Sequence, residues 1–135
     1  MIGIDTNVLV RYIVQDDPKQ AATANHFLER SLSSAEPGWI AAIVLCELVW
    51  VLETAYGYAR SPVATLLARL FEVDRFRVEA PSVAWRALEA YRGGADFADA
   101  LIALANQDAG CDHTVTFDRA ATRLKSMRLL VREAG

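Results

Sequence analysis

The stretch that decides the fold is MIGIDTNVLVRYI, residues 1–13. Its first four residues are apolar or glycine, and the acid Asp5 ends that run. Apolar side chains then recur at the spacing of one helix face: Val8, Leu9, Tyr12 and Ile13. The pattern predicts a short buried strand over residues 1–4 that ends at Asp5 and leads directly into a helix.

The same alternation of strand and helix repeats along the chain. Further strands are expected at 76–80, 114–117 and 129–131, while 40–44 fits either a strand or the beginning of a helix. Helices are expected to start at Asp17-Pro18 and at Ser61-Pro62, to cover 45–56, to run from a cap at Ser82 to Gly93-Gly94, and to run from about 97 to 108. This order predicts an α/β fold, a three-layer α/β/α arrangement around a central, mainly parallel sheet of four or five strands.

Length and composition are those of one globular domain. The chain has 135 residues, of which 53% are hydrophobic and 23% are charged. No repeat or second domain is indicated, so residues 1–135 are expected to form a single domain. The start of the chain lacks a positively charged leader and no apolar stretch could span a bilayer, which predicts a cytoplasmic protein without membrane contact. Cys46 and Cys111 are expected to stay reduced.

The net charge of −3 argues against binding to nucleic acid, but the kind of basic residue argues for it. Of the 14 basic residues 12 are arginines, whose guanidinium groups suit bidentate contact with phosphate. Five basic residues also gather in the tail: Arg119, Arg123, Lys125, Arg128 and Arg132. These side chains fit either a solvated helix face or a phosphate-binding surface.

Glu47 is the only charged residue between Trp39 and Leu52. Because its neighbours are apolar, we expect the surroundings of this carboxylate to be buried. An unpaired buried carboxylate costs several kcal/mol, so Glu47 must be paired, protonated, exposed at a helix edge or bound to a cation.

Each of the other notable acids has a structural explanation when it is considered alone. Asp5 and Asp118 each follow an expected strand, where an acid can simply cap the next helix. Asp96 and Asp99 are three residues apart at the start of a helix, which matches a capping box with Asp96 as the N-cap. Asp99 fits that explanation less well, because its neighbours on the helix are apolar.

Taken together, these acids indicate a metal site. The carboxyl ends of parallel strands meet at one edge of a sheet, and Asp5 and Asp118 both lie at such ends. Several carboxylates about 4 Å apart repel one another by roughly 4 kcal/mol per pair, so they require a cation. Mg²⁺ and Mn²⁺ prefer oxygen ligands. His26 and His113 show no metal-ligand spacing, so a competing nitrogen site is not expected.

The chain resembles the PIN-domain ribonucleases, most closely the VapC-type toxins of bacterial toxin-antitoxin pairs. The resemblance rests on IDTNVLVR at 4–11, the helix of Glu47, DFADALIA at 96–103 and the closing TFD at 116–118. It implies a PIN-like nuclease fold and a Mg²⁺- or Mn²⁺-dependent endoribonuclease. The family's acidic quartet, both catalytic and metal-binding, falls on Asp5, Glu47, Asp99 and Asp118.

The resemblance also suggests accessory groups and partners. Thr6, Asn7 and Asp96 would lie beside the quartet, and Arg11 and Arg119 are candidates for holding an RNA backbone. The expected partners are an RNA substrate, a second copy in a homodimer, and a cognate antitoxin that joins a larger complex. Two other interpretations remain: a catalytically silent PIN-like domain that binds RNA or a partner, and a receiver-like signalling domain that binds Mg²⁺.

Overall fold

The computed structural model describes residues 1–133, and its five strands are all parallel to their neighbours. The strands are β1 (Ile2–Gly3), β2 (Gly38–Ile40), β3 (Phe76–Val78), β4 (Thr114–Thr116) and β5 (Met127–Leu129). The predicted α/β fold with a parallel sheet is confirmed. The strands form two sheets, however: a three-stranded sheet in the order β1-β2-β3, consistent with a three-layer α/β/α fold, and a separate β4-β5 pair.

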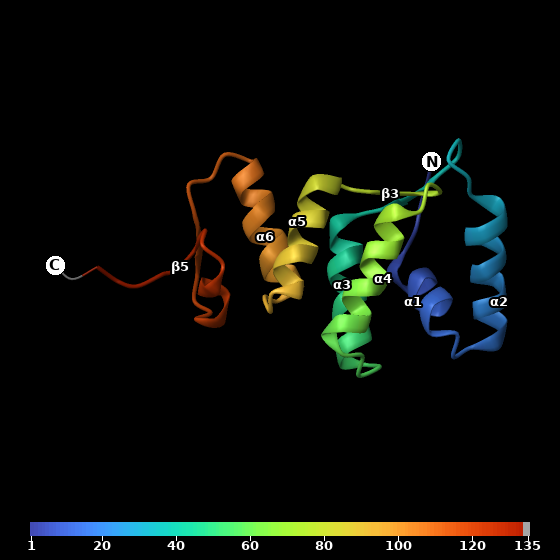
Figure 1. Ribbon diagram of the computed structural model, residues 1–135, viewed down its shortest axis with the longest axis horizontal. Helices are drawn as coiled ribbons and strands as arrows, with labels where there is room; N and C mark the ends of the chain where they lie inside the picture. Colours follow the sequence, from blue (N-terminus) through green and yellow to red (C-terminus); the bar gives the residue numbers. More distant parts are fainter. Residues whose placement is uncertain (134–135) are drawn as a thin grey trace.

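Six α-helices connect and cover these strands in the described part of the chain (Figure 1). They are α1 (Thr6–Val14), α2 (Pro18–His26), α3 (Ala42–Thr54), α4 (Arg60–Glu72), α5 (Pro81–Arg92) and α6 (Phe97–Asp108). A π-helical turn, η1 (Phe27–Ser31), continues α2, and a 3₁₀ turn, η2 (Ala120–Arg123), joins β4 to β5. Among residues 1–133 no helix has the length and apolar character that crossing a membrane requires.

Local signals account for several of the helix boundaries. The Asp17 carboxylate accepts a hydrogen bond from the Gln20 amide (3.0 Å), and Pro18 occupies the first turn, as the sequence predicts for the start of α2. The ambiguous segment 40–44 divides, since β2 ends at Ile40 and α3 begins at Ala42. The last strand lies two residues earlier than predicted, because Met127 is buried whereas Leu130 and Val131 are exposed.

Most of the core lies in what we call the main body, residues 2–108. Three leucines of α3, at positions 45, 48 and 52, are completely buried, as are residues of α4, which packs against this helix, and of α5, which packs against α4. Tyr91 and Phe97 pack edge to face across the α5–α6 turn, with ring centroids 6.0 Å apart. Burial of each such side chain contributes about 1.5–3 kcal/mol, so the main body accounts for most of the hydrophobic stabilisation.

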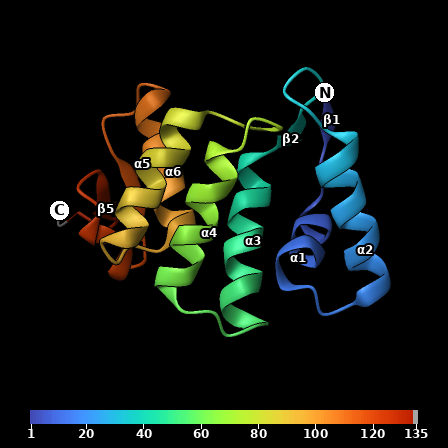
Figure 2. The ribbon, with the colours of Figure 1, turned by 45° about the vertical axis from the view of Figure 1, so that its right-hand side comes forward.

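The carboxy-terminal unit, residues 114–129, contains β4, η2 and β5 and lies at one end of the molecule (Figures 1 and 2). Its own core is small and consists of Ala121 and Met127 packed on Ala103 of α6, with Leu124 half-buried beside them. The Arg123 guanidinium holds the unit to the main body by donating to the Gly94 carbonyl (2.8 Å) and the Gly93 carbonyl (3.2 Å).

The prediction that residues 1–4 form a buried strand is wrong for most of that segment. Ile2 and Gly3 are exposed, and only Ile4 is buried. The reason is that β1 is an edge strand in this structure and pairs only with β2. Its amides at Ile2 and Ile4 donate to the Pro37 carbonyl (3.0 Å) and the Trp39 carbonyl (2.9 Å). The other edge of β1 is open to solvent.

Candidate active site

Asp5 and Glu47 are joined through Thr6. Asp5 follows β1 and is the N-cap of α1, where its carboxylate accepts a hydrogen bond from the Thr6 amide (2.7 Å). The Thr6 side chain is buried, and its hydroxyl donates to Glu47 Oε1 (3.0 Å). Thr6, predicted as an accessory residue, therefore connects the end of β1 with the middle of α3.

The expectation that Glu47 has buried surroundings is only partly correct. Leu48 and Val49 are buried, but Glu47 itself is exposed. It shares an open face of α3 with Ile43 and Trp50, whose side chains are 70% and 66% exposed. The sequence suggested burial because a helix that is almost wholly apolar is normally packed against other elements on every side. In this structure, one side of α3 is exposed instead.

Asp96, Asp99 and Asp118 lie close together at a second location. Asp96 is the N-cap of α6 and accepts from the Asp99 amide (3.0 Å), as the predicted capping box requires. The pKa of Asp99 is raised, first by burial and then by the negative charges of Asp96 and Asp118. Asp118 follows β4 and accepts from the Ala120 amide (2.9 Å), so it also caps the turn η2.

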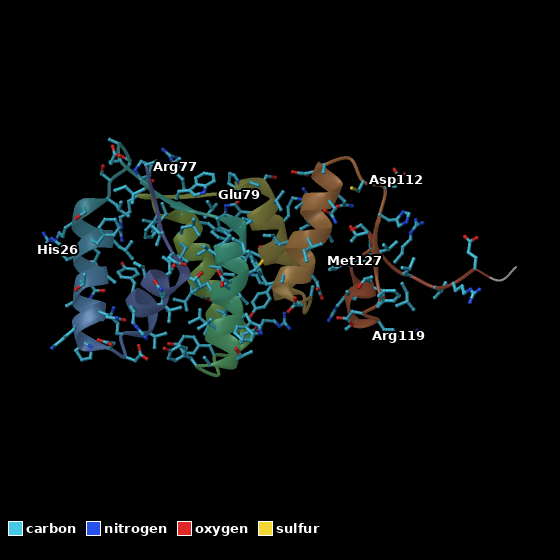
Figure 3. The ribbon with its side chains drawn as sticks, turned by 180° about the vertical axis from the view of Figure 1, so that it is seen from behind. His26, Arg77, Glu79, Asp112, Arg119 and Met127 are labelled. Carbon is cyan, nitrogen blue, oxygen red and sulfur yellow. The ribbon has the colours of Figure 1, made fainter. Side chains whose placement is uncertain are left out.

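Three arginines line a cavity of about 650 Å³ together with Asp96 and Asp99, between the α5–α6 turn and η2. Arg119, which the sequence singled out, lines this cavity together with Arg123 and Arg60 (Figure 3 labels Arg119 at η2). Arg60 donates to the carbonyls of Tyr91 (2.8 Å) and Ala95 (2.6 Å). The cavity therefore combines carboxylates with guanidinium groups, a suitable environment for a phosphate beside an acid.

Sequence reasoning did not find Arg60 or its neighbour Glu53, which accepts from the Tyr91 hydroxyl (3.0 Å). The Tyr91 pKa is raised, first by burial and then by the hydrogen bond to Glu53. Neither Arg60 nor Glu53 belongs to a recognisable motif. Arg123, in contrast, is one of the tail residues that the sequence offered as a phosphate-binding surface.

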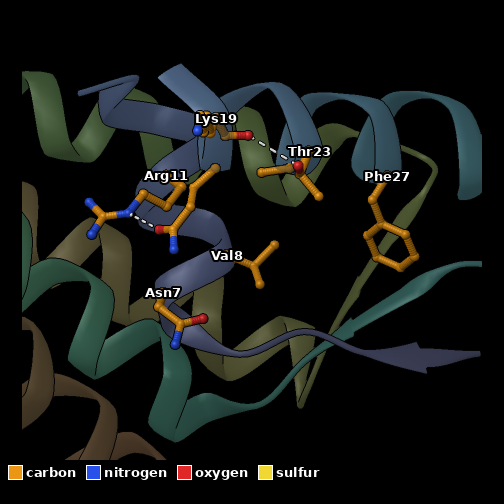
Figure 4. A pocket seen from close by; sticks show the side chains of 8 residues that line it. Asn7, Val8, Arg11, Lys19, Thr23 and Phe27 are labelled. Atoms are coloured by element: carbon orange, nitrogen blue, oxygen red, sulfur yellow. Dashed lines mark hydrogen bonds between the residues drawn. The ribbon is translucent and has the colours of Figure 1, made fainter. Parts of the chain in front are cut away.

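Asn7 and Arg11 line a different pocket, between α1 and α2 (Figure 4). The Arg11 guanidinium donates to Gln20 (2.6 Å) and forms an ion pair with Asp16 (3.0 Å). A hydrogen bond with Tyr56, followed by the charge of Asp16, raises the Arg11 pKa. Since Arg11 is engaged by these groups, its predicted role in holding RNA receives no support from its contacts.

The predicted quartet thus divides into two pairs, with Asp5 and Glu47 at one location and Asp99 and Asp118 at the other. Charges at both locations act on Cys46 of α3. Burial raises the pKa of this thiol, and the charges of Asp96 and Glu47 raise it further. The oxygen donors suit Mg²⁺ or Mn²⁺ chemically, but within residues 1–133 no three Asp, Glu, His or Cys side chains gather closely enough to hold a metal ion. One chain in this arrangement does not fit a complete metal site.

Comparison with known protein families identifies the group to which the chain belongs. The model of the PIN domain matches residues 2–126. The chain belongs to the PIN-domain family. PIN domains are generally nucleases and typically bind divalent metals such as Mg²⁺, so membership supports a metal-dependent nuclease. Among curated proteins and among solved structures, no match to this PIN domain was found.

Proposed function

We propose that this PIN domain is a Mg²⁺- or Mn²⁺-dependent endoribonuclease that hydrolyses RNA phosphodiester bonds with Asp5, Glu47, Asp99 and Asp118. The observation that carries the proposal is the combination of the family match with acids at the ends of β1 and β4, in α3 and in the first turn of α6. Bound cations of this kind lower the pKa of water and neutralise charge on a scissile phosphate. The family match sets aside the receiver-like alternative.

The cavity beside Asp99 favours a phosphate-containing substrate. The Arg119 guanidinium makes no hydrogen bond or ion pair with any other residue of the described chain, so it is available to a phosphate, whereas the guanidinium groups of Arg60 and Arg123 are tied to carbonyls. Arg119→Gln should weaken RNA binding, and the matched variant Arg128→Gln, at an exposed position of β5, should not. Equal affinities of all three proteins in a filter-binding assay would contradict a role for Arg119.

Cleavage of RNA tests the activity directly. Purified wild-type protein should cut RNA with Mg²⁺ or Mn²⁺ and stop when EDTA is added, while Asp5→Asn and Asp99→Asn should each lose most of this activity. Asp17→Asn is the matched control, because Asp17 caps α2 as Asp5 caps α1 but lies outside the acid pairs. Full cleavage by Asp5→Asn would overturn the assignment. RNA binding without cleavage by the wild type would favour a catalytically silent PIN domain.

We further propose that the nuclease is a VapC-type toxin of a type II toxin-antitoxin pair, acting in the cytoplasm as a homodimer that a cognate antitoxin neutralises in a larger complex. The support is the resemblance of IDTNVLVR and DFADALIA to that subfamily. Expression of the wild type should arrest bacterial growth, and Asp5→Asn should not. Co-expression of the protein encoded by the neighbouring reading frame should restore growth and co-purify with the wild type; failure of both would refute the toxin role.

A further inference from the structure

The cavity between α1 and α2 begins close to the first pair of acids along the chain. Its volume of about 590 Å³ falls within the range of pockets that hold small organic molecules, about 300–1,000 Å³. Asn7, in the first turn of α1, lines this cavity and directly follows Thr6, which joins Asp5 to Glu47. The cavity is thus one residue away from that acid pair in the sequence, although neither of the two acids lines it.

Phe27 gives the cavity an aromatic wall. It is the first residue of the π-helical turn η1, and turns of this kind are frequent at functional sites. Its half-buried ring packs against the main core and also lines the cavity, where Val8 and Ala24 add apolar surface. Figure 4 shows Phe27 and Asn7 on either side of Val8. An aromatic ring that is held on one side and open on the other can stack with a second planar group.

Polar groups with unused hydrogen-bonding capacity line the same cavity. Within residues 1–133, neither the Asn7 side-chain amide nor the Lys19 ammonium makes a hydrogen bond or an ion pair. The side-chain oxygen of Gln20 accepts from the Arg11 guanidinium (2.6 Å), while its NH₂ group has no partner in this part of the chain. An amide carries a donor and an acceptor side by side, which is the arrangement with which Asn and Gln recognise the edge of a base.

The charge of the lining favours a nucleotide as the occupant. No acidic residue of the described chain lines this cavity, whereas Glu29 lines the cavity between α1 and α4, and Asp99 lines the cavity beside η2. The charge of Arg11 is offset by its ion pair with Asp16 (3.0 Å), but the Lys19 ammonium remains to attract a phosphate. The aromatic wall, the amides and the ammonium match the ring of a base, its polar edge and its phosphate.

We propose that the cavity between α1 and α2 binds one unstacked base of a single-stranded RNA substrate beside the phosphodiester bond that is cut. The proposal deepens the proposed nuclease function and rests on it for the identity of the substrate. The base stacks on Phe27 and presents its edge to the amides of Asn7 and Gln20. Lys19 contacts a neighbouring phosphate. Arg11 is a positioning residue, because it holds the Gln20 side chain without touching the base.

A base subsite of this kind makes cleavage selective in two ways. Bases within a duplex are stacked on one another and are not free to stack on a side chain, so single strands and loops should be cut and duplexes spared. Stacking by itself accepts every base, because every base has a π face, whereas amide groups distinguish the edges of the bases. We therefore expect a preference for particular bases at one position beside the cut.

Fluorescence tests base binding without any measurement of cleavage. Phe27→Trp places an indole in the cavity, and a base that stacks on it should quench the emission that this variant adds to that of the wild type. In EDTA, a short single-stranded RNA should quench the added emission, whereas the same RNA in a duplex and ribose 5-phosphate, which has no base, should not. Tyr12→Trp is the matched control, because Tyr12 is also half-buried but lines the cavity between α1 and α4. Equal quenching of both variants, or no quenching of Phe27→Trp, would overturn the proposal.

Affinity and cleavage-site measurements then distinguish a base subsite from a structural role of the same residues. Phe27→Leu should weaken the binding of single-stranded RNA on the order of tenfold, and Phe27→Tyr should not, because only the first variant lacks an aromatic ring. Gln20→Glu keeps an oxygen for Arg11 but replaces a donor with an acceptor, so it should change which base is preferred beside the cut. Wild-type affinity of Phe27→Leu together with an unchanged base preference of Gln20→Glu would refute the subsite.

Failure of the base subsite and failure of the nuclease give different results. If the wild type cuts RNA but single-stranded RNA does not quench Phe27→Trp, the subsite is refuted and the nuclease stands. If the wild type does not cut RNA but Phe27→Trp is quenched, the nuclease is refuted and the cavity still binds a base. Quenching of Phe27→Trp by the protein encoded in the neighbouring reading frame, and not by RNA, would show that the cavity is a protein interface and would refute the proposal.

Discussion

The main body and the carboxy-terminal unit are built from the same kinds of element but differ in how much they bury. In the main body, α3 alone has three completely buried leucines and packs against α4 and α6. In the carboxy-terminal unit, only Ala121 and Met127 are buried, and Phe117 just beyond β4 is almost wholly exposed. The difference shows that these parallel strands are stabilised mainly by side chains packed against the helices that cover them, because strands this short contribute few hydrogen bonds of their own.

The candidate site draws its acids from both regions. Asp5 and Glu47 belong to the well-packed main body, whereas Asp118 belongs to the weakly packed unit and Asp99 lies on α6 beside it. Elements with few buried contacts open locally at low free energy. The position of Asp118 relative to the other acids therefore depends on the less stable region.

The largest expected effect of a substitution is in the core of the main body. Leu48→Ala should lower the free energy of unfolding by about 3–5 kcal/mol, because it leaves a cavity around a completely buried position of α3. Urea denaturation followed by circular dichroism measures the loss. Trp50→Ala, on the exposed face of the same helix, should change the value by less than about 0.5 kcal/mol. Similar losses for both would contradict the open face of α3.

Arg60→Ala should have the next largest effect and lower the free energy of unfolding by about 2–3 kcal/mol. Its guanidinium lies 4.5 Å from the centre of the Tyr91 ring and donates to two carbonyls, at Tyr91 and Ala95, which would lose their partner. Arg69→Ala, an exposed change on the same helix, serves as the control in the same urea titration. If the two variants unfold at the same urea concentration, Arg60 does not tie α4 to the α5–α6 turn.

Met127→Ala should lower the free energy of unfolding of the carboxy-terminal unit by about 2 kcal/mol, the low end of the range for such a truncation. The destabilisation should be confined to this unit. Removing the largest buried side chain of the carboxy-terminal unit should abolish hydrogen-exchange protection over residues 114–129. The amides of α3 should exchange as in the wild type. Arg128→Ala, an exposed neighbour, should leave both regions unchanged. Loss of protection throughout the molecule would show that the two regions unfold as one.

The smallest expected effect concerns the charge of Asp99. Because its pKa in the folded protein is raised, the ionised carboxylate destabilises the fold above that pKa, and this cost disappears as the pH falls through it. In EDTA at pH 7, Asp99→Asn should therefore raise the Tm by about 1–2 °C, and the difference from wild type should vanish in acid. Thermal denaturation of Asp112→Asn, an exposed loop variant, should show neither effect.

The sequence by itself determined the type of fold and the identity of the acids. The spacing of apolar residues predicted parallel strands alternating with helices, and α6 begins and ends where the pattern predicts, at Phe97 and Asp108. The capping role of Asp96 was predictable as well, because it depends only on groups within one turn of helix. Such features are local, so neighbours in the sequence are sufficient to specify them.

Only the tertiary structure decided which surfaces are covered and which acids meet. The apolar surroundings of Glu47 in the sequence suggested burial, but the face of α3 that carries it is open. The strand ends at Asp5 and Asp118 suggested one sheet edge, but β1 and β4 lie in separate sheets. Strand pairing joins residues that are distant along the chain. An amphipathic or apolar pattern specifies that a face needs a partner, but it does not specify which segment supplies that partner.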